Sequence, residues 1–374
     1  MIHFLTPEYP PLHGGVSDYT HQIATELTRG GQAVHVWGPS GSAQQPGSPI
    51  VVHPDLGRFS SADLRRAGRL LDEHPSPRRL VVHWVPHGFG RRGMNLPFCL
   101  WLWRRSIAGD AVELIVHEPF VTFTGGARQC AVAVVQRAMT LMLLSAARRV
   151  WVTTRAWSPL LEPYMSGRST VVEWLPVPSS LQSADATAVR KVRARYAPAN
   201  ECLIGHFGTY GSLITSLLVD AIPLLAEASP AARFVFIGSD GATFRSALVA
   251  RHRSLADRVS ATGTLSSSDL SAHIAACDVM LQPYPDGVTS RRTTAMAGLF
   301  ARVPVVTTQG TLTEGLWQDE RAVKLAEVGD VRAIVQHVVQ LLADPAERRR
   351  QGEAGRAVYD RWFDVRHAVA ALAS

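Results

Sequence analysis

Residues 285–306 read PDGVTSRRTTAMAGLFARVPVV and contain a turn, a helix and a strand in succession. The first three residues, Pro-Asp-Gly, are typical turn residues. The apolar run that follows predicts a helix from about residue 289 to just before Pro304. The valines on both sides of Pro304 favour a strand. A helix that leads directly into a strand is typical of α/β proteins.

The same alternation extends over most of the chain and predicts two domains. Strands are expected at 2–5, 33–37, 79–83, 112–116, 150–153 and 170–174, and again at 202–207, 233–237, 258–262, 278–282, 303–307 and 321–325. This order predicts an α/β fold of two facing Rossmann-like, doubly wound domains with an interdomain cleft. The expected parts are an N-terminal domain of residues 1–178 with a C-terminal helix at about 357–374, a linker at 179–199, and a C-terminal domain of residues 200–356.

The composition is that of a globular protein with a modest positive charge. Of the 374 residues, 46% are hydrophobic and 18% are charged, and the formal net charge is +7. Much of the positive charge comes from pairs of arginines such as Arg104–Arg105 and Arg291–Arg292. Such pairs usually lie on solvated helix faces; the alternative is that they attract phosphate groups or an anionic membrane. The four cysteines form no CxxC pair, so neither a zinc knuckle nor a disulfide framework is indicated. The N-terminus lacks a signal-peptide pattern, and we expect a cytoplasmic protein without a nucleic-acid partner.

Three glycine-containing turns follow predicted strands. Gly14 and Gly15 precede the first helix, where unpaired backbone N–H groups can bind an anion; a plain strand-to-helix turn is the alternative. A second turn, GHFGTYGS, offers hydroxyl and N–H groups to phosphate, and a third, FVFIGSDG, contains Asp240. The candidate phosphate contacts of the second turn are Gly208, Thr209, Tyr210 and Ser212.

Histidines stand at the ends of two predicted strands. His117 and Glu118 end the strand at 112–116, on the edge where open α/β sheets bind ligands. A structural and a functional role are equally favoured for His117. A structural role is favoured for His83 and His87.

The opening stretch has the chemistry to bind a diphosphate. If the helix begins at residue 289, its N–H groups, the hydroxyls of Thr289 and Ser290, and Arg291 converge. A helix cap with solvated arginines is the alternative. The chain has no GxxxxGK[ST], GxSxG or HExxH motif and no common spacing of metal ligands, so no metal site is expected.

Taken in order, these pieces resemble the GT-B-fold glycosyltransferases, in particular the retaining family 4, or group 1. The resemblance covers nearly the whole chain. It rests on GGVSDYTHQIATELTRGGQAVHVWGP (14–39), FVFIGSDG (234–241), TGTLSSSDLSAHIAACDVMLQPYPDG (262–287), AMAGLFARVPVVTT (295–308) and VYDRWFD (358–364).

The resemblance implies a nucleotide-diphosphate-sugar donor as co-substrate and no other cofactor. Gly14 and Gly15 would contact this donor from the first domain, and His117 would lie beside the transferred sugar. Asp240, Thr264 and Leu265 would lie near the nucleoside. The sugar and the diphosphate would be held by Asp286, Gly287, Val288, Thr289 and Ser290.

The chain departs from the family pattern at two places. The usual Glu-x7-Glu is matched by Asp286 and Thr294, and the usual Arg and Lys after the strand at 202–207 are absent. We therefore predict that Arg291 replaces these cations at the helix N-terminus, while Arg292 points about 100° away. The predicted catalytic residues are His117, Asp286 and Arg291.

The predicted activity is that of a hexosyltransferase that retains anomeric configuration and needs no metal. The alternatives are a catalytically silent scaffold or sugar-nucleotide sensor, and a sugar-nucleotide epimerase. Residues 96–106, LPFCLWLWRRS, form a buried helix or contact the inner face of a membrane peripherally. The nucleotide, the sugar, the acceptor and the oligomeric state stay open.

Overall fold

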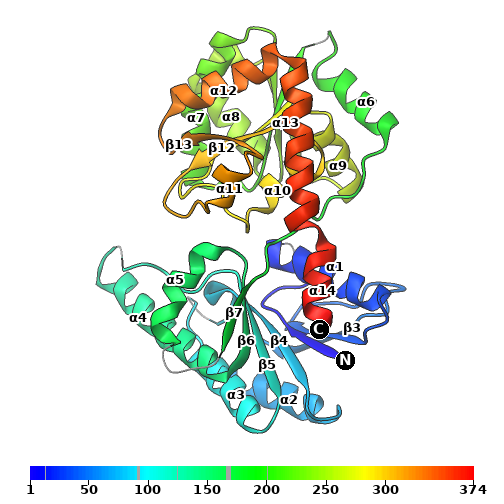
Figure 1. Cartoon of the computed structure of the whole chain (residues 1–374), viewed down its shortest axis with the longest axis vertical. Helices are drawn as coiled ribbons and strands as arrows, with labels where there is room; N and C mark the ends of the chain where they lie inside the picture. The colour runs from blue at the N-terminus through cyan, green and yellow to red at the C-terminus, as the bar shows by residue number, and fades with distance from the viewer. Residues whose placement is uncertain (13, 91–92, 124, 166–169, 200) are drawn as a thin grey trace. The chain divides into compact units, whose positions relative to one another are not determined.

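The computed structural model describes residues 1–12, 14–90, 93–123, 125–165, 170–199 and 201–374. The chain forms two compact units, one of Met1–Val177 with Val365–Ser374 and the other of Pro178–Asp364. Each unit is a parallel sheet flanked by helices (Figure 1). The predicted α/β fold with two Rossmann-like domains is therefore confirmed.

The first unit contains a sheet of seven strands in the order β3-β2-β1-β4-β5-β6-β7. The strands are β1 (Ile2–Leu5), β2 (Val34–Pro39), β3 (Val51–Gly57), β4 (Arg79–Trp84), β5 (Ala111–Val116), β6 (Ala147–Val152) and β7 (Val171–Trp174). The helices are α1 (Gly15–Arg29), α2 (Ser61–Asp72), α3 (Leu96–Ile107), α4 (Ala127–Ala146), α5 (Ser158–Leu161) and α14 (Val365–Ala373). The strand order reverses between β1 and β4, and a doubly wound sheet binds ligands beyond the carboxyl ends of such strands.

The core of the first unit explains why its strands are continuous apolar runs. Helices cover both faces, so alternate residues on opposite faces, such as Phe4 and Leu5, are both fully buried. Ile23 and Leu27 of α1 are one turn apart and share the buried side of that helix. The C-terminal helix α14 returns to this unit, where Arg79 donates a hydrogen bond to the carbonyl of Leu372 at 2.5 Å.

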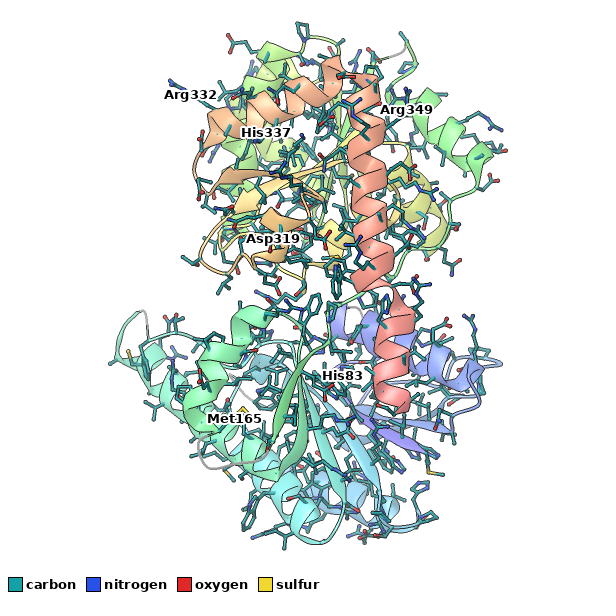
Figure 2. The ribbon with its side chains drawn as sticks, in the orientation of Figure 1. His83, Met165, Asp319, Arg332, His337 and Arg349 are labelled. Carbon is teal, nitrogen blue, oxygen red and sulfur yellow. The ribbon has the colours of Figure 1, made fainter. Side chains whose placement is uncertain are left out.

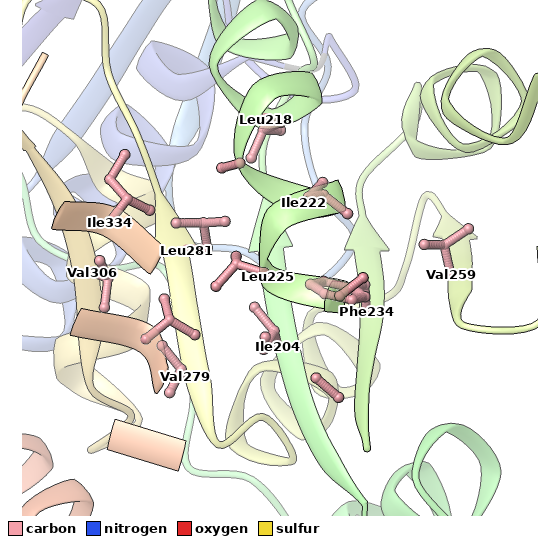
Figure 3. Close-up of a cluster of buried hydrophobic side chains, with 14 of the residues drawn as sticks. Ile204, Leu218, Ile222, Leu225, Phe234, Val259, Val279, Leu281, Val306 and Ile334 are labelled. Atoms are coloured by element: carbon pink, nitrogen blue, oxygen red, sulfur yellow. The ribbon is translucent and has the colours of Figure 1, made fainter. Parts of the chain in front are cut away.

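The second unit contains a sheet of six strands in the order β10-β9-β8-β11-β12-β13. The strands are β8 (Cys202–Phe207), β9 (Ala232–Ile237), β10 (Val259–Gly263), β11 (Val279–Gln282), β12 (Val305–Gln309) and β13 (Lys324–Glu327). The helices are α6 (Ala186–Tyr196), α7 (Ser212–Ala228), α8 (Gly241–Arg251), α9 (Ser267–Ala275), α10 (Thr293–Phe300), α11 (Leu316–Asp319), α12 (Val331–Ala343) and α13 (Pro345–Val358). In Figure 3, Leu218, Ile222 and Leu225 of α7 pack against Ile204 and Leu281 of the sheet.

The chain departs from the predicted boundaries in three segments. Strand β3 (Val51–Gly57) was not predicted, because it is an edge strand whose side chains are mostly exposed or half-buried. The expected linker at 179–199 contains α6, which docks on the second unit through an ion pair between Arg193 and Asp278. Tyr359–Phe363 also cluster with the second unit, where the Tyr359 hydroxyl accepts a hydrogen bond from the backbone of Ser179 at 3.2 Å. Residue 200, the expected start of the second domain, lies outside the described residues.

Helix α10 begins at Thr293, so the predicted start at residue 289 is wrong. The preceding loop is anchored elsewhere, since the backbone of Val288 donates to the carbonyl of Thr308 at 2.8 Å. Gly287 has a φ of +87°, and a Cβ there would lie 2.1 Å from Oγ1 of Thr313. The loop therefore packs against residues 308–313 and cannot wind into the first turn of the helix.

Helix α4 (Ala127–Ala146) is long and apolar enough to cross a membrane by length and composition. It is partly buried, with 39% of its most apolar window inside the protein. Helix α3, the stretch weighed as a membrane contact, buries Phe98, Cys99 and Leu102, while Ile107 remains 66% exposed. Residues 96–106 therefore lie in a helix with one buried face, and the exposed large apolar side chains of this stretch are Leu96 and Trp103.

Candidate functional site

A pocket of about 200 Å³ lies at the carboxyl ends of β8 and β11 in the second unit. It joins two segments that the sequence analysis treated separately, the turn after β8 and the loop before α10. Among the predicted site residues it is lined by Gly208, Thr209, Arg291 and Thr294. The remaining lining residues are His206, Phe207, Ile214, Gln282, Tyr284, Arg292 and Thr293.

Two buried side chains in this pocket carry unpaired polar atoms. Gln282 is fully buried, and neither its Nε2 nor its Oε1 has a hydrogen-bond partner among the described residues. His206 bonds the carbonyl of Leu281 through Nδ1 at 2.7 Å, and its buried Nε2 has no such partner. Burial lowers the pKa of His206 to about 4, so the ring is neutral near pH 7. Buried polar atoms left unpaired are costly, which indicates that the pocket is built for a polar ligand.

Asp286 pairs with both arginines of the loop. Its Oδ2 lies 3.4 Å from Nη2 of Arg291, and its Oδ1 pairs with Nη2 of Arg292. Arg292 also lies over the ring of Tyr284, 4.6 Å from the centroid. Both arginines precede α10 and both line the pocket, so the prediction that Arg292 points away from Arg291 around a helix is wrong.

Three residues that were predicted to contact the donor form hydrogen bonds with other residues of the protein. Ser290 donates from its backbone and its hydroxyl to the two carboxylate oxygens of Glu314, each at 2.6 Å. The hydroxyl of Thr294 lies 2.7 Å from that of Tyr284. Tyr210 is buried, and its hydroxyl proton is shared between the carbonyl oxygens of His206 and Ile237, which lie 3.0 and 3.3 Å from the hydroxyl oxygen. These hydroxyls hold the loops around the pocket.

Val288 and Thr289 are fully buried beside this loop, and the hydroxyl of Thr289 has no partner among the described residues. Glu314 was missed by the sequence analysis. The sequence contained a signal for it, because Glu314 is an acidic residue shortly after the strand predicted at 303–307. Asp240 and Asp286 likewise follow predicted strands. Glu314 also accepts a hydrogen bond from the indole of Trp317 at 3.2 Å.

A second pocket, of about 580 Å³, is lined by α7, α8 and the turns before them. It is lined by Tyr210, Ser212 and Asp240 among the predicted site residues, and neither Arg291 nor Arg292 lines it. Thr264 and Leu265 follow β10, with Thr264 exposed and Leu265 half-buried. They line neither pocket.

In the first unit, the N-terminus of α1 already holds a carboxylate. Oε1 of Glu8 accepts hydrogen bonds from the backbone N–H groups of Val16 and Ser17 at 3.0 and 3.1 Å. Gly14 leaves room for this carboxylate, since a Cβ there would lie 2.1 Å from it, whereas a Cβ on Gly15 would meet nothing within 4 Å. The N–H groups of Val16 and Ser17 at this helix N-terminus are therefore paired with the protein's own Glu8 in this structure, and the predicted contact of Gly14 and Gly15 with the donor stays a prediction.

His117 follows β5 and stacks on His83 of β4. Its Nε2 lies 3.1 Å from Nδ1 of His83, and Tyr19 packs edge-on against both rings (Figure 2 labels His83). The indole of Trp157 donates to the carbonyl of His117 at 2.9 Å. His83 is fully buried, and burial, then the nearby His117, keep its pKa well below the usual value. The exposed His87 lies 3.4 Å from Glu118.

Residues 203–344 match the protein family described as Glycosyl transferases group 1. Similar solved structures include sucrose-phosphate synthase from Thermosynechococcus elongatus, with a TM-score of 0.76, 18% identity and coverage of 100% of this chain and 98% of that one. HepE from Anabaena, solved with UDP-glucose, has a TM-score of 0.70 and 17% identity, and the match covers 100% of this chain and 98% of HepE. An α,α-trehalose-phosphate synthase from Burkholderia xenovorans, solved with glucose-6-phosphate, has a TM-score of 0.68, 14% identity and coverage of 95% of both chains.

Similarity to these structures at such identities shows the GT-B fold, and the family match covers most of the second unit. A search of curated proteins finds no match. The predicted resemblance to the GT-B glycosyltransferases is confirmed.

Proposed function

We propose that this chain, whose residues 203–344 match the group 1 glycosyltransferases, moves a hexosyl group from a nucleotide-diphosphate-sugar to an acceptor hydroxyl. The observation that carries the proposal is the pocket at the ends of β8 and β11. It combines two arginines with buried polar atoms of Gln282 and His206 that have no hydrogen-bond partner in the described part of the chain. Such a site suits a ligand that brings both negative charge and hydrogen-bonding groups.

The arginines supply the charge that the missing Arg and Lys of the family pattern would have supplied. A diphosphate bears negative charge that grows when the sugar leaves, and two guanidinium groups stabilise that charge. Asp286 now neutralises both of them. The donor's phosphates therefore compete with Asp286 for the arginines, and donor binding releases this carboxylate toward the sugar.

In the proposed reaction the acceptor hydroxyl attacks the anomeric carbon while the nucleoside diphosphate departs. The family resemblance supports retention of anomeric configuration. Charge stabilisation by Arg291 and Arg292 supports a reaction that does not require a divalent metal. His117 is the proposed contact of the transferred sugar, and its stacking on the neutral His83 holds its ring in one orientation.

UDP-glucose is the first donor to test, because HepE was solved with it. We further propose a cytoplasmic location, and peripheral contact with the inner face of a membrane if the acceptor is lipid-linked.

The test is a thermal-shift screen with UDP, GDP, ADP and dTDP and their sugars, without and then with metal. A ligand at 100 times its dissociation constant adds about 2.7 kcal/mol to the stability of the folded state. Variants Arg291→Ala and Arg292→Ala should each weaken binding at least about tenfold, because both residues line the pocket. Arg332→Ala, at an exposed position of α12, is the matched control (Figure 2).

The outcomes separate the candidate functions. Binding with sugar transfer or slow donor hydrolysis supports the transferase. Binding without either reaction would identify a sugar-nucleotide sensor, and interconversion of sugar epimers would identify an epimerase. If no nucleotide stabilises the wild-type protein, the proposal fails.

A further inference from the structure

Four histidines gather on one face of the first sheet. His3 in β1 is in register with His35 in β2, and residues in register point to the same face of a parallel sheet. His53 in β3 is in register with Trp37, two residues after His35 and therefore on the same face. His74 follows α2 and completes the cluster, with its ring 4.8 Å from that of His3 and 4.6 Å from that of His35.

The cluster stands apart from the candidate transferase residues of the same unit. His3 and His35 are each the second residue of their strand, near the amino ends. His117 follows the carboxyl end of β5, which is parallel to these strands and in the same sheet. No role in sugar transfer therefore accounts for the cluster.

The nitrogens of this cluster are placed for a common ligand. Potential ligand atoms of His3, His35 and His74 all lie within 4.8 Å of one another. Zinc binds imidazole nitrogens at about 2.0–2.1 Å, which places two tetrahedral ligands about 3.3 Å apart. The three rings would close on one ion by moving about an ångström. His3 is buried, whereas His35 and His74 are half-buried.

Imidazole binds metal ions in its neutral form. Neutral imidazole offers a lone pair, and no proton has to be displaced from an imidazolium.

One of the remaining contacts, between His35 and His53, resembles the outer shell of a metal site. Nδ1 of His35 lies 2.9 Å from Nε2 of His53, which leaves Nε2 of His35 for an ion. Trp37 stacks on His53 at 3.9 Å and donates a hydrogen bond to Nδ1 of His3 at 3.2 Å. Trp37 can only donate, so an ion on His3 must either replace this bond or turn the ring over. Either change alters the environment of the indole.

We propose that His3, His35 and His74 form a binding site for a divalent transition-metal ion such as Zn²⁺. Imidazole is a preferred ligand of such ions. The ion would tie β1, β2 and the segment after α2 together and stabilise the folded first unit. The site does not depend on the proposed transferase function.

The experiment uses the full chain, treated with a chelator and then titrated with Zn²⁺ or Co²⁺. We expect one ion per chain, a higher melting temperature with Zn²⁺ and a visible absorption band with Co²⁺. His74→Ala should weaken Zn²⁺ binding at least about 100-fold, since it removes one of three ligands. Because His74 lies outside the strands, this variant keeps the sheet intact.

Two further variants make the result specific. His252→Ala, in the second unit, should bind like the wild type. Trp37→Phe should still bind Zn²⁺ but lose the change in tryptophan fluorescence that accompanies binding. The proposal is overturned if the wild type binds less than one ion per chain at micromolar Zn²⁺. Equal affinities of wild type and His74→Ala would overturn it as well.

Discussion

Ser290 donates two hydrogen bonds to Glu314, one from its backbone and one from its hydroxyl, each 2.6 Å long. Both residues are buried, and the carboxylate also accepts from the indole of Trp317. This contact joins the loop before α10 to the segment after β12. It fixes the backbone next to the two arginines of the pocket.

Replacing Glu314 by alanine should destabilise the second unit by about 2–3 kcal/mol. The substitution leaves the buried N–H and hydroxyl of Ser290 and the indole of Trp317 without their acceptor. Chemical denaturation would measure the loss. The control is Glu353→Ala, at a side chain that is 68% exposed and should cost less than about 1 kcal/mol. Equal effects of the two substitutions would contradict the anchoring role of Glu314.

Asp286→Asn should strengthen the binding of a nucleoside diphosphate. The neutral amide no longer competes with the phosphates for Arg291 and Arg292, and a gain of about tenfold corresponds to about 1.4 kcal/mol. Sugar transfer should fall at the same time, since Asp286 is the proposed contact of the sugar. Calorimetric titration with UDP and a transfer assay test the two effects separately. Weaker UDP binding in this variant would show that Asp286 positions the arginines rather than competing for them.

Glu8→Ala should lower the stability of the first unit by about 1 kcal/mol, the usual cost of losing a helix N-cap. Glu8 occupies the N-terminus of α1 through two backbone N–H groups, at 3.0 and 3.1 Å. Glu26→Ala removes a carboxylate from the other end of the same helix, where it pairs with the exposed Arg29, and serves as the control. Thermal unfolding measures both. A Glu8 variant as stable as the control would indicate that water replaces the carboxylate without loss.

Acid should weaken the second unit through His206. Burial lowers its pKa from 6.5 to about 4. Between these two pH values the unfolded chain binds a proton at His206, whereas the folded chain does not. The contribution of His206 is fully present above about pH 6.5 and is lost as pH falls toward 4, by about 3 kcal/mol in total. His206→Gln should therefore flatten the pH dependence of the unfolding free energy, and His252→Gln should not. The prediction fails if the two variants have the same pH slope.

The fold was largely predictable because its signals are local. Runs such as 2–5 and 202–207 are apolar and uninterrupted, since helices bury both faces of a parallel sheet, and both became strands with these bounds. Helix α1 (Gly15–Arg29) begins at the glycine pair that was expected to precede the first helix. β3 lacks such a signal because it is an edge strand whose side chains are mostly exposed or half-buried.

The sequence by itself determined the α/β alternation, the glycine turns at the strand ends and the chemistry available there. Tertiary structure alone decided which of these groups meet. The start of α10, the pairing of both arginines with Asp286 and the anchoring of Ser290 by Glu314 depend on loops that pack across the sheet. The cluster of His3, His35 and His74 was invisible to spacing rules because its members come from three segments far apart in the chain. The periodicity of side chains indicates which face of a helix or strand is buried. A site, however, is assembled from several helices, strands and loops. The register of the strands relative to one another is set only when the sheet forms.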